Sequence, residues 1–297
     1  MTSVADFIKL PKADYHSTLN FGMRYPSYVA WAGFYVPDFP ADGSQVTEEL
    51  TNQIREYTFL RTGCSQDIQK LVSLSLAESI GDNIAKINGA LSIELLSKYD
   101  TPATITELLK ATSEKYSAQI ELNTYLSVDS DHFTPAAFSF AEELLKSDFF
   151  KGIYIFGKNL FTSPEDFIPL VKIAEAKNLK IKINAKKAES CTALAKLFRT
   201  FVPSSVVQPD FSEDKKTAAL FRQQNIQAIL TPKSRETGRT ARLLRDFLEA
   251  GADVKLGTQS ILLCNKSISQ FASELCNTGI FTKEEMTALI QESSSSR

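Results

Sequence analysis

Residues 179–208 read LKIKINAKKAESCTALAKLFRTFVPSSVVQ, and this stretch indicates the fold class. Apolar and polar residues alternate at 179–184, which predicts a strand. Residues 189–201 have the spacing of an amphipathic helix, and a second short apolar run follows at 205–208. A strand, a helix and a strand in this order are typical of a unit in which both strands run parallel.

The same unit repeats along the chain. The pattern predicts eight strands, at residues 12–19, 90–96, 119–128, 152–156, 179–184, 205–208, 226–230 and 252–256. Helices are expected at 104–115 with Thr104 as its cap, at 163–177, 189–201, 214–224, 239–250 and 266–275, and from 134 and 282 onward. Eight strands that alternate with helices favour a closed (β/α)₈ TIM barrel. A doubly wound open sheet is the alternative, although no G-x-G-x-x-G follows the first strand.

The domain organisation follows from this pattern. We expect one barrel domain over residues 1–297, with a long insertion after the first strand at about 20–80 and a frayed polar tail at 292–297. Residues 20–43 are rich in Gly, Pro and aromatic side chains and are expected to form a loop. This loop is either a lid over a pocket or an ordinarily packed connection.

Composition excludes several classes of protein. The formal net charge of −2 gives no general field for nucleic acid. No apolar run approaches the roughly 18 residues of a membrane span, so we expect no membrane partner. The four cysteines are scattered without a C-x-x-C pair, which favours free thiols in a reducing, cytoplasmic setting.

Several strand ends resemble those of the adenosine deaminase family of the amidohydrolase superfamily. Residues 10–19, LPKADYHSTL, are similar to the family's opening strand, roughly L-P-K-A-E-L-H-x-H-L. Weaker matches follow in the same order: 152–157 (GIYIFG) to G-x-D-L-x-G, 179–187 to a strand ending H-A-G-E, 205–209 to R-I-G-H-G, 229–234 to C-P-x-S, 250–260 to A-G-V-x-V-x-L-N-T-D-D, and 281–285 to the closing helix. The resemblance spans most of the chain and implies the barrel of a metal-dependent hydrolase.

The resemblance also shows which catalytic positions have changed. The family holds zinc with two histidines of the first strand, one of the fifth and an aspartate of the eighth, and adds a glutamate after the fifth strand and a histidine after the sixth. Only His16 remains at these positions, which otherwise hold Thr18, Asn184, Lys187, Gln208, Gln259 and Ser260. The chain has only two histidines, and the other is His132. Neutral Thr, Asn and Gln are poor zinc ligands, so we expect no metal and no cofactor. The H-x-E and P-C-x-x-C pattern of the unrelated zinc nucleobase deaminases is absent as well.

The same strand ends are the candidate ligand site. The positions are His16, Thr18, Gly157, Asn184, Lys187, Gln208, Gln259 and Ser260. No catalytic residue is assigned, since Lys187 and Gln208 stand at substituted positions. His16 is either a relic or a ligand contact. Lys187 and its neighbour Lys186 are either solvated lysines or a cationic anchor for phosphate or carboxylate, and a Schiff-base role for Lys187 is a third interpretation.

Strand parity predicts charged residues inside the barrel. Lys182 shares a face with Asn184, and Asp14 shares one with His16. Glu121 and Lys255 have similar inward positions. Because unpaired buried charges are costly, we expect Lys182 within salt-bridge distance of Asp14 or Glu121, as a replacement for the charge of zinc. A shift of some strands by one residue would reverse these faces.

Three functions therefore remain open. The first is a metal-free pseudoenzyme of the adenosine deaminase-like group with a binding or structural role. The second is a metal-free enzyme of another class, acting on a small polar or anionic substrate such as a nucleoside or sugar phosphate through His16, Lys187, Asn184 and Gln208. The third is an active hydrolase or deaminase whose metal ligands lie elsewhere. Any of them fits a small polar or anionic ligand in the barrel mouth, and an oligomer is compatible with each.

Overall fold

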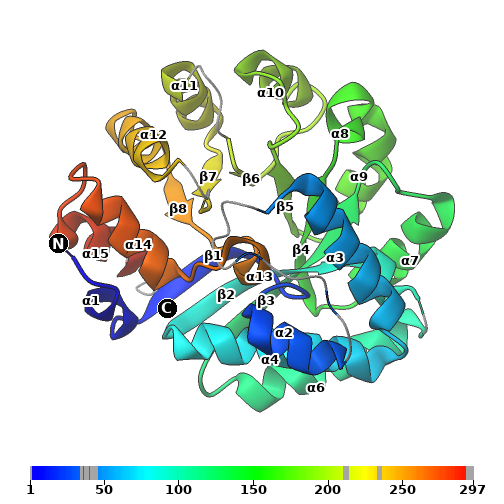
Figure 1. Ribbon diagram of the computed structural model, residues 1–297. Helices are drawn as coiled ribbons and strands as arrows, with labels where there is room; N and C mark the ends of the chain where they lie inside the picture. The colour runs from blue at the N-terminus through cyan, green and yellow to red at the C-terminus, as the bar shows by residue number, and fades with distance from the viewer. Residues whose placement is uncertain are drawn as a thin grey trace.

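The computed structural model describes residues 2–33, 36, 40, 46–98, 100–209, 214–232 and 236–291. Eight parallel strands form one sheet in the order of the chain (Figure 1). They are β1 (Lys12–Thr18), β2 (Ile84–Ser92), β3 (Glu121–Asp129), β4 (Phe150–Phe156), β5 (Lys180–Asn184), β6 (Ser205–Val207), β7 (Gln227–Leu230) and β8 (Val254–Leu256). A parallel bridge between Ser17 and Gln259 brings the two edges together, so the predicted (β/α)₈ barrel is confirmed.

Helices surround the barrel, as Figure 1 shows. They are α1 (Ala5–Ile8), α2 (Tyr25–Ala32), α3 (Glu48–Arg61), α4 (Ser65–Gly81), α5 (Ile93–Leu96), α6 (Pro102–Tyr116), α7 (Pro135–Lys146), α8 (Asn159–Thr162), the 3₁₀ helix η2 (Pro164–Phe167), α9 (Ile168–Ala176), α10 (Cys191–Leu197), α11 (Asp214–Gln224), α12 (Thr237–Glu249), α13 (Ile261–Cys264), α14 (Ile268–Asn277) and α15 (Lys283–Gln291). Within the described ranges, every helix is too short or too polar to span a bilayer.

Apolar side chains separate into an outer and an inner core. The larger core packs the outward faces of the strands against the helices, with Leu126, Ile153 and Ile183 among its buried members. A smaller cluster inside the barrel contains Tyr125 and Tyr154. The tyrosine rings fill much of the interior that aliphatic side chains usually fill in such barrels.

Two expectations about local structure were wrong. The second strand was expected at 90–96, but it spans Ile84–Ser92, and Ile93–Leu96 is a short helix with three buried side chains. The helix expected from 104 begins at Pro102, because the Thr101 hydroxyl accepts the Thr104 amide. The start of β2 could not be recognised in the sequence, because half-exposed Lys86 interrupts the apolar pattern there. Burial in the folded barrel, rather than local alternation, defines where this strand begins.

The loop expected at 20–43 contains a helix. Pro26 stands in the first turn of α2, where its missing N–H is not needed, and Gly33 ends the helix with a φ of 77°. Residues 34–35, 37–39 and 41–45 lie outside the described part of the chain, as do 210–213, 233–235 and the tail 292–297.

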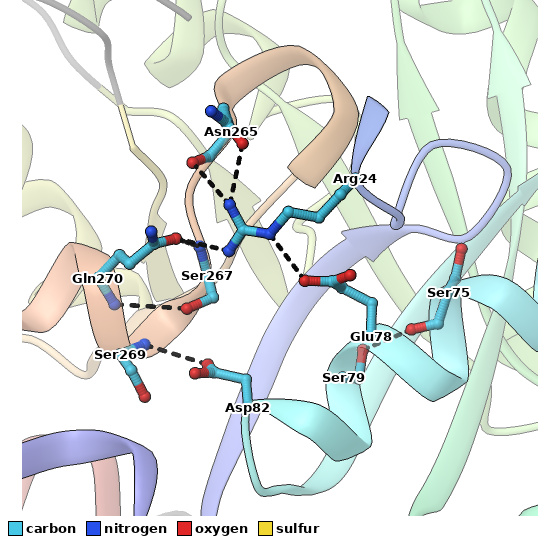
Figure 2. A network of polar contacts seen from close by, with 9 residues as sticks. All are labelled: Arg24, Ser75, Glu78, Ser79, Asp82, Asn265, Ser267, Ser269 and Gln270. Carbon is cyan, nitrogen blue, oxygen red and sulfur yellow. Dashed lines mark hydrogen bonds and ion pairs between the residues drawn. The ribbon is translucent and has the colours of Figure 1, made fainter. Parts of the chain in front are cut away.

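A polar network fixes the helices on both sides of β1 (Figure 2). The Arg24 guanidinium donates to Glu78 on α4 (2.9 Å), Asn265 after α13 (2.9 Å) and Gln270 on α14 (2.8 Å). A groove of about 420 Å³ lies beside it, and none of the predicted site residues lines it. The network therefore holds the frame around the barrel and is separate from the strand ends.

Candidate functional site

His16 lies at the end of β1 with no exposed surface. Its ring packs against Tyr154 on β4, with 4.4 Å between the ring centroids and an angle of 53°. Neither ring nitrogen has a hydrogen-bond partner among the described residues. Burial, and then the nearby charge of Lys182, keep the pKa of His16 well below its usual value, so the imidazole is neutral. Two unmet hydrogen-bonding atoms therefore face the inside of the barrel mouth.

Asn184 is the last residue of β5 and lies next to Tyr154, the ring that packs against His16. Its amide donates to the Tyr154 hydroxyl at 2.7 Å, and its carbonyl oxygen accepts the backbone N–H of Lys186 at 2.7 Å. Burial raises the pKa of Tyr154, so the phenol keeps its proton. The side chain at the family's zinc position thus belongs to a neutral hydrogen-bonded chain.

Gln208 and Gln259 meet across the carboxyl ends of β6 and β8. The Gln208 amide donates to the Gln259 carbonyl oxygen and, at 3.0 Å, to the Thr231 hydroxyl, which donates in turn to Gln259 at 3.1 Å. Both glutamines have positive φ, 56° and 60°, a conformation that favours glycine. Such strain collects at functional sites. The buried carbonyl oxygen of Gln208 has no partner in the described part of the chain, so this cluster also has unmet hydrogen-bonding capacity.

Three of the predicted site residues determine the local backbone structure. The Ser260 hydroxyl accepts the Leu263 amide at 3.2 Å and so caps α13. Thr18 is half-buried, and its amide donates to the Gln259 carbonyl at 2.6 Å. Gly157 has a φ of 110°, and a Cβ there would lie 2.4 Å from the Ser130 hydroxyl. These residues shape the rim of the site.

Lys187 forms an exposed ion pair with helix α3. Its ammonium lies 2.9 Å from the Glu48 carboxylate at the start of α3, and both side chains are exposed. This ion pair lowers the pKa of Glu48. An exposed, paired ammonium is not the desolvated amine that Schiff-base chemistry requires.

Lys182 and Asp14 are buried inside the barrel, as strand parity predicted, each with 1% of its surface exposed. The Lys182 ammonium donates to the Tyr15 carbonyl at 2.8 Å and lies 4.1 Å from the Tyr125 ring centroid. Burial lowers the pKa of Lys182 to about 7 and raises the pKa of Asp14 to about 6. The charges act on each other, but the expected direct salt bridge is not formed between these two described residues. Asp14 instead accepts hydrogen bonds from Thr258 and the His16 amide.

One of the other two predicted interior charges lies elsewhere. Glu121 is exposed at the beginning of β3 and pairs with Lys86 at 2.9 Å. Lys255 does take the predicted inward position, since its neighbours Val254 and Leu256 belong to the outer core. Its ammonium lies 5.7 Å from the centroid of the Tyr15 ring and 3.5 Å from the Asp253 carboxylate. The expectation that Glu121 would meet Lys182 was therefore wrong, because Glu121 stands at the amino end of its strand.

Two contributors were not recognised in the sequence. Tyr154 occupies the aspartate position of the family's G-x-D-L-x-G motif, and that substitution was the signal for it. Arg55 reaches the mouth from α3, with its guanidinium 5.5 Å from the centroid of the Phe156 ring. No sequence signal connects Arg55 to β4, because the contact depends on where α3 packs.

The residues at these positions do not suit the zinc ion that the resemblance implies. His132 is 76% exposed after β3 and bonds Asp129, so it does not join His16. No group of three His, Cys, Asp or Glu side chains suited to a metal occurs within the described ranges. Asn184 and Gln259 bring neutral amides, and Lys182 brings a positive charge. This donor set does not suit a divalent cation.

Comparison with known proteins shows which sequences and structures the chain is similar to. No protein-family model matches the sequence. The chain is 24% identical over 299 residues to a Treponema pallidum (strain Nichols) protein named "Putative adenosine/adenine deaminase", covering 98% of this chain and 99% of that one. The solved ADAL–IMP complex has a TM-score of 0.77 at 15% identity, covering 97% and 92% of the two chains. The N6-methyl-AMP deaminase of Arabidopsis thaliana has a TM-score of 0.74 at 15% identity, covering 98% and 92%. In sequence the chain is therefore similar to this adenosine/adenine deaminase-like relative, and in fold it is similar to these deaminase-related barrels.

Proposed function

We propose that this protein binds a purine nucleoside or nucleotide in the barrel mouth and does not catalyse zinc-dependent deamination. One observation carries the proposal: buried His16, with both ring nitrogens unpartnered, stands among neutral amides where the family has zinc ligands. The purine class comes from the similar solved structures, one a complex with IMP and one an N6-methyl-AMP deaminase.

Unmet hydrogen-bonding capacity supports ligand binding. Buried polar atoms in proteins nearly always have partners. Both His16 nitrogens and the Gln208 carbonyl oxygen have none within the ranges that the structure describes. A heterocycle with donors and acceptors along its edge can satisfy such atoms, and glutamine amides pair well with adenine-type edges. Ordered water would fill the same positions in the free protein.

Positive charge at the rim favours a nucleotide over an uncharged base. Arg55 lies over Phe156, and Lys186 is close enough to Glu48 to affect its carboxyl group. Guanidinium groups recognise phosphate through paired donors. An anionic group at the rim and a purine edge toward Gln208 would use both parts of the site.

The substituted residues argue against the family's reaction. Zinc deamination requires a metal that lowers the pKa of a bound water, and a group that transfers a proton to the ring. The proton-transfer position holds Lys187, whose exposed ammonium is paired with Glu48. Among the described residues at the family's catalytic positions, none has a carboxyl group that could transfer this proton.

Three measurements on the purified protein test the proposal. We expect no stoichiometric zinc by mass spectrometry, no conversion of adenosine, adenine, AMP or N6-methyl-AMP, and saturable binding of AMP or IMP by calorimetry. Gln208→Ala should weaken binding about tenfold, because a buried hydrogen bond is lost. Gln223→Ala on the exposed face of α11 is the control and should leave affinity unchanged.

The same assays decide the alternatives. Turnover in metal-free protein would favour the enzyme of another class. Turnover with one equivalent of metal would favour relocated ligands, and either result would contradict the proposal. Absence of binding to every purine compound would refute the ligand assignment.

A further inference from the structure

Lys182 occupies a cage inside the barrel that suits a cation. The side chain is 1% exposed, and its ammonium donates to the Tyr15 carbonyl at 2.8 Å. The same nitrogen lies 4.1 Å from the centroid of the Tyr125 ring. A carbonyl oxygen and an aromatic face both attract an ammonium group. These contacts compensate part of the cost of burying a charged lysine.

Asp14 supplies the balancing negative charge. Its carboxylate accepts the amides of His16 (3.0 Å) and Thr258 (3.1 Å) and the Thr258 hydroxyl (2.5 Å). Asp14 and Lys182 affect each other's ionisation although they do not form a salt bridge. With both groups ionised, this layer of the interior has no net charge.

Lys182 stands directly below the positions of the family's zinc ligands. It precedes Asn184 by two residues on the same inward face of β5, and its ammonium contacts the carbonyl of the residue before His16. A divalent ion beside His16 would add two positive charges next to an ammonium. Repulsion between such charges is strong where water is excluded. Thr18, Asn184 and Gln259 offer no negative charge to offset it.

We propose that Lys182 is the built-in cation of this barrel and that its ammonium, held by Tyr15 and Tyr125, excludes a divalent ion from the strand ends. This inference deepens the proposed function and rests on it. Rejection of the metal then has two causes, the lost ligands and the lysine charge. Restoring the ligands alone will not restore tight binding.

A two-by-two comparison of variants tests the lysine separately. One background is the natural chain, and the other carries Thr18→His, Asn184→His and Gln259→Asp. Each is made with Lys182 and with Lys182→Met. Zn²⁺ binding is measured by calorimetry, and Co²⁺ binding by its visible absorption, which reports coordination directly.

In the restored-ligand background we expect Lys182→Met to tighten Zn²⁺ binding by ~100-fold or more, since the ion then becomes the partner of Asp14. Lys180→Met is the matched control, because Lys180 lies on the same strand with an exposed side chain. It should change the affinity less than about threefold. Circular dichroism and thermal unfolding verify folding, and Lys182→Gln replaces Lys182→Met if the latter does not fold.

Two results would overturn the inference. One is tight Zn²⁺ binding by the restored-ligand protein that still has Lys182. The other is an affinity that Lys182→Met leaves unchanged in that background, including no binding by either protein. Stoichiometric zinc in the natural chain would instead refute the proposed function, so the two failures are distinguishable.

Discussion

The Lys187 ammonium lies 2.9 Å from the Glu48 carboxylate, so the residue at the family's proton-transfer position is bonded to helix α3. The two residues are separated by 139 positions in the chain. The contact joins the end of β5 to the beginning of α3. Lys187 thus contributes to the position of α3.

Removal of Lys187 should therefore have a small effect. An exposed ion pair contributes ~0–1 kcal/mol to stability. We expect Lys187→Ala to change the affinity for AMP less than about threefold and the unfolding free energy less than ~1 kcal/mol, measured by calorimetry and urea denaturation. Glu48→Ala should have the same effect on stability. A loss of affinity of tenfold or more would instead identify Lys187 as an anionic anchor.

Substitution of the strained Gln208, which follows β6, should affect ligand binding more than stability. Gln208 has a φ of 56°, which glycine adopts freely. We expect Gln208→Gly to change the unfolding free energy by less than ~1 kcal/mol while AMP binding weakens, because relief of strain offsets the lost hydrogen bonds. Urea denaturation and calorimetry measure the two effects. A loss of stability above ~2 kcal/mol would show that the amide cluster mainly supports the fold.

Arg24 should matter for stability and not for the site. Its guanidinium bonds Glu78, Asn265 and Gln270, which lie on both sides of β1 (Figure 2). We expect Arg24→Met to lower the unfolding free energy by ~1–3 kcal/mol, since hydrogen bonds to a charged group are lost. Arg199→Met, at an exposed position, is the control. Unchanged stability would mean that solvent replaces the whole network.

The buried lysine predicts a pH dependence of stability. Burial lowers the pKa of Lys182 to about 7, whereas the unfolded chain keeps the ordinary value near 10.4. Between these values the unfolded state binds more protons, so stability due to this group rises with pH.

The effect is measured as a difference between two proteins. From pH 7 to pH 9.5, the natural chain should gain at least ~1 kcal/mol of stability relative to Lys182→Met. Lys180→Met serves as the control, with a constant difference from the natural chain. A constant difference for Lys182→Met as well would mean that Lys182 keeps an ordinary pKa in the fold.

Much of the fold could be predicted because burial leaves a local pattern. The strand near residues 179–184 and helix α11 (Asp214–Gln224) were found at nearly their observed bounds. The same alternation placed Lys182 inside the barrel. The start of β2 could not be found, since half-exposed Lys86 interrupts its apolar run. Helix α2 was missed because Gly and Pro suggested a loop, although Pro26 and Gly33 mark the ends of a helix.

The site was only partly predictable for a different reason. Strand ends meet at one face of a barrel, so His16, Asn184, Gln208 and Gln259 could be grouped from the order of elements alone. The contact of His16 with Tyr154 and the direction of Lys187 depend on side-chain packing. No spacing in the sequence encodes those contacts.

The most direct measurement is a titration of the purified natural chain with Zn²⁺, combined with its zinc content as isolated. Our account predicts no stoichiometric zinc and an affinity far weaker than the nanomolar range typical of functional zinc sites, because neutral amides stand at the ligand positions and the Lys182 ammonium lies beside them. One equivalent of tightly bound zinc per chain would contradict it.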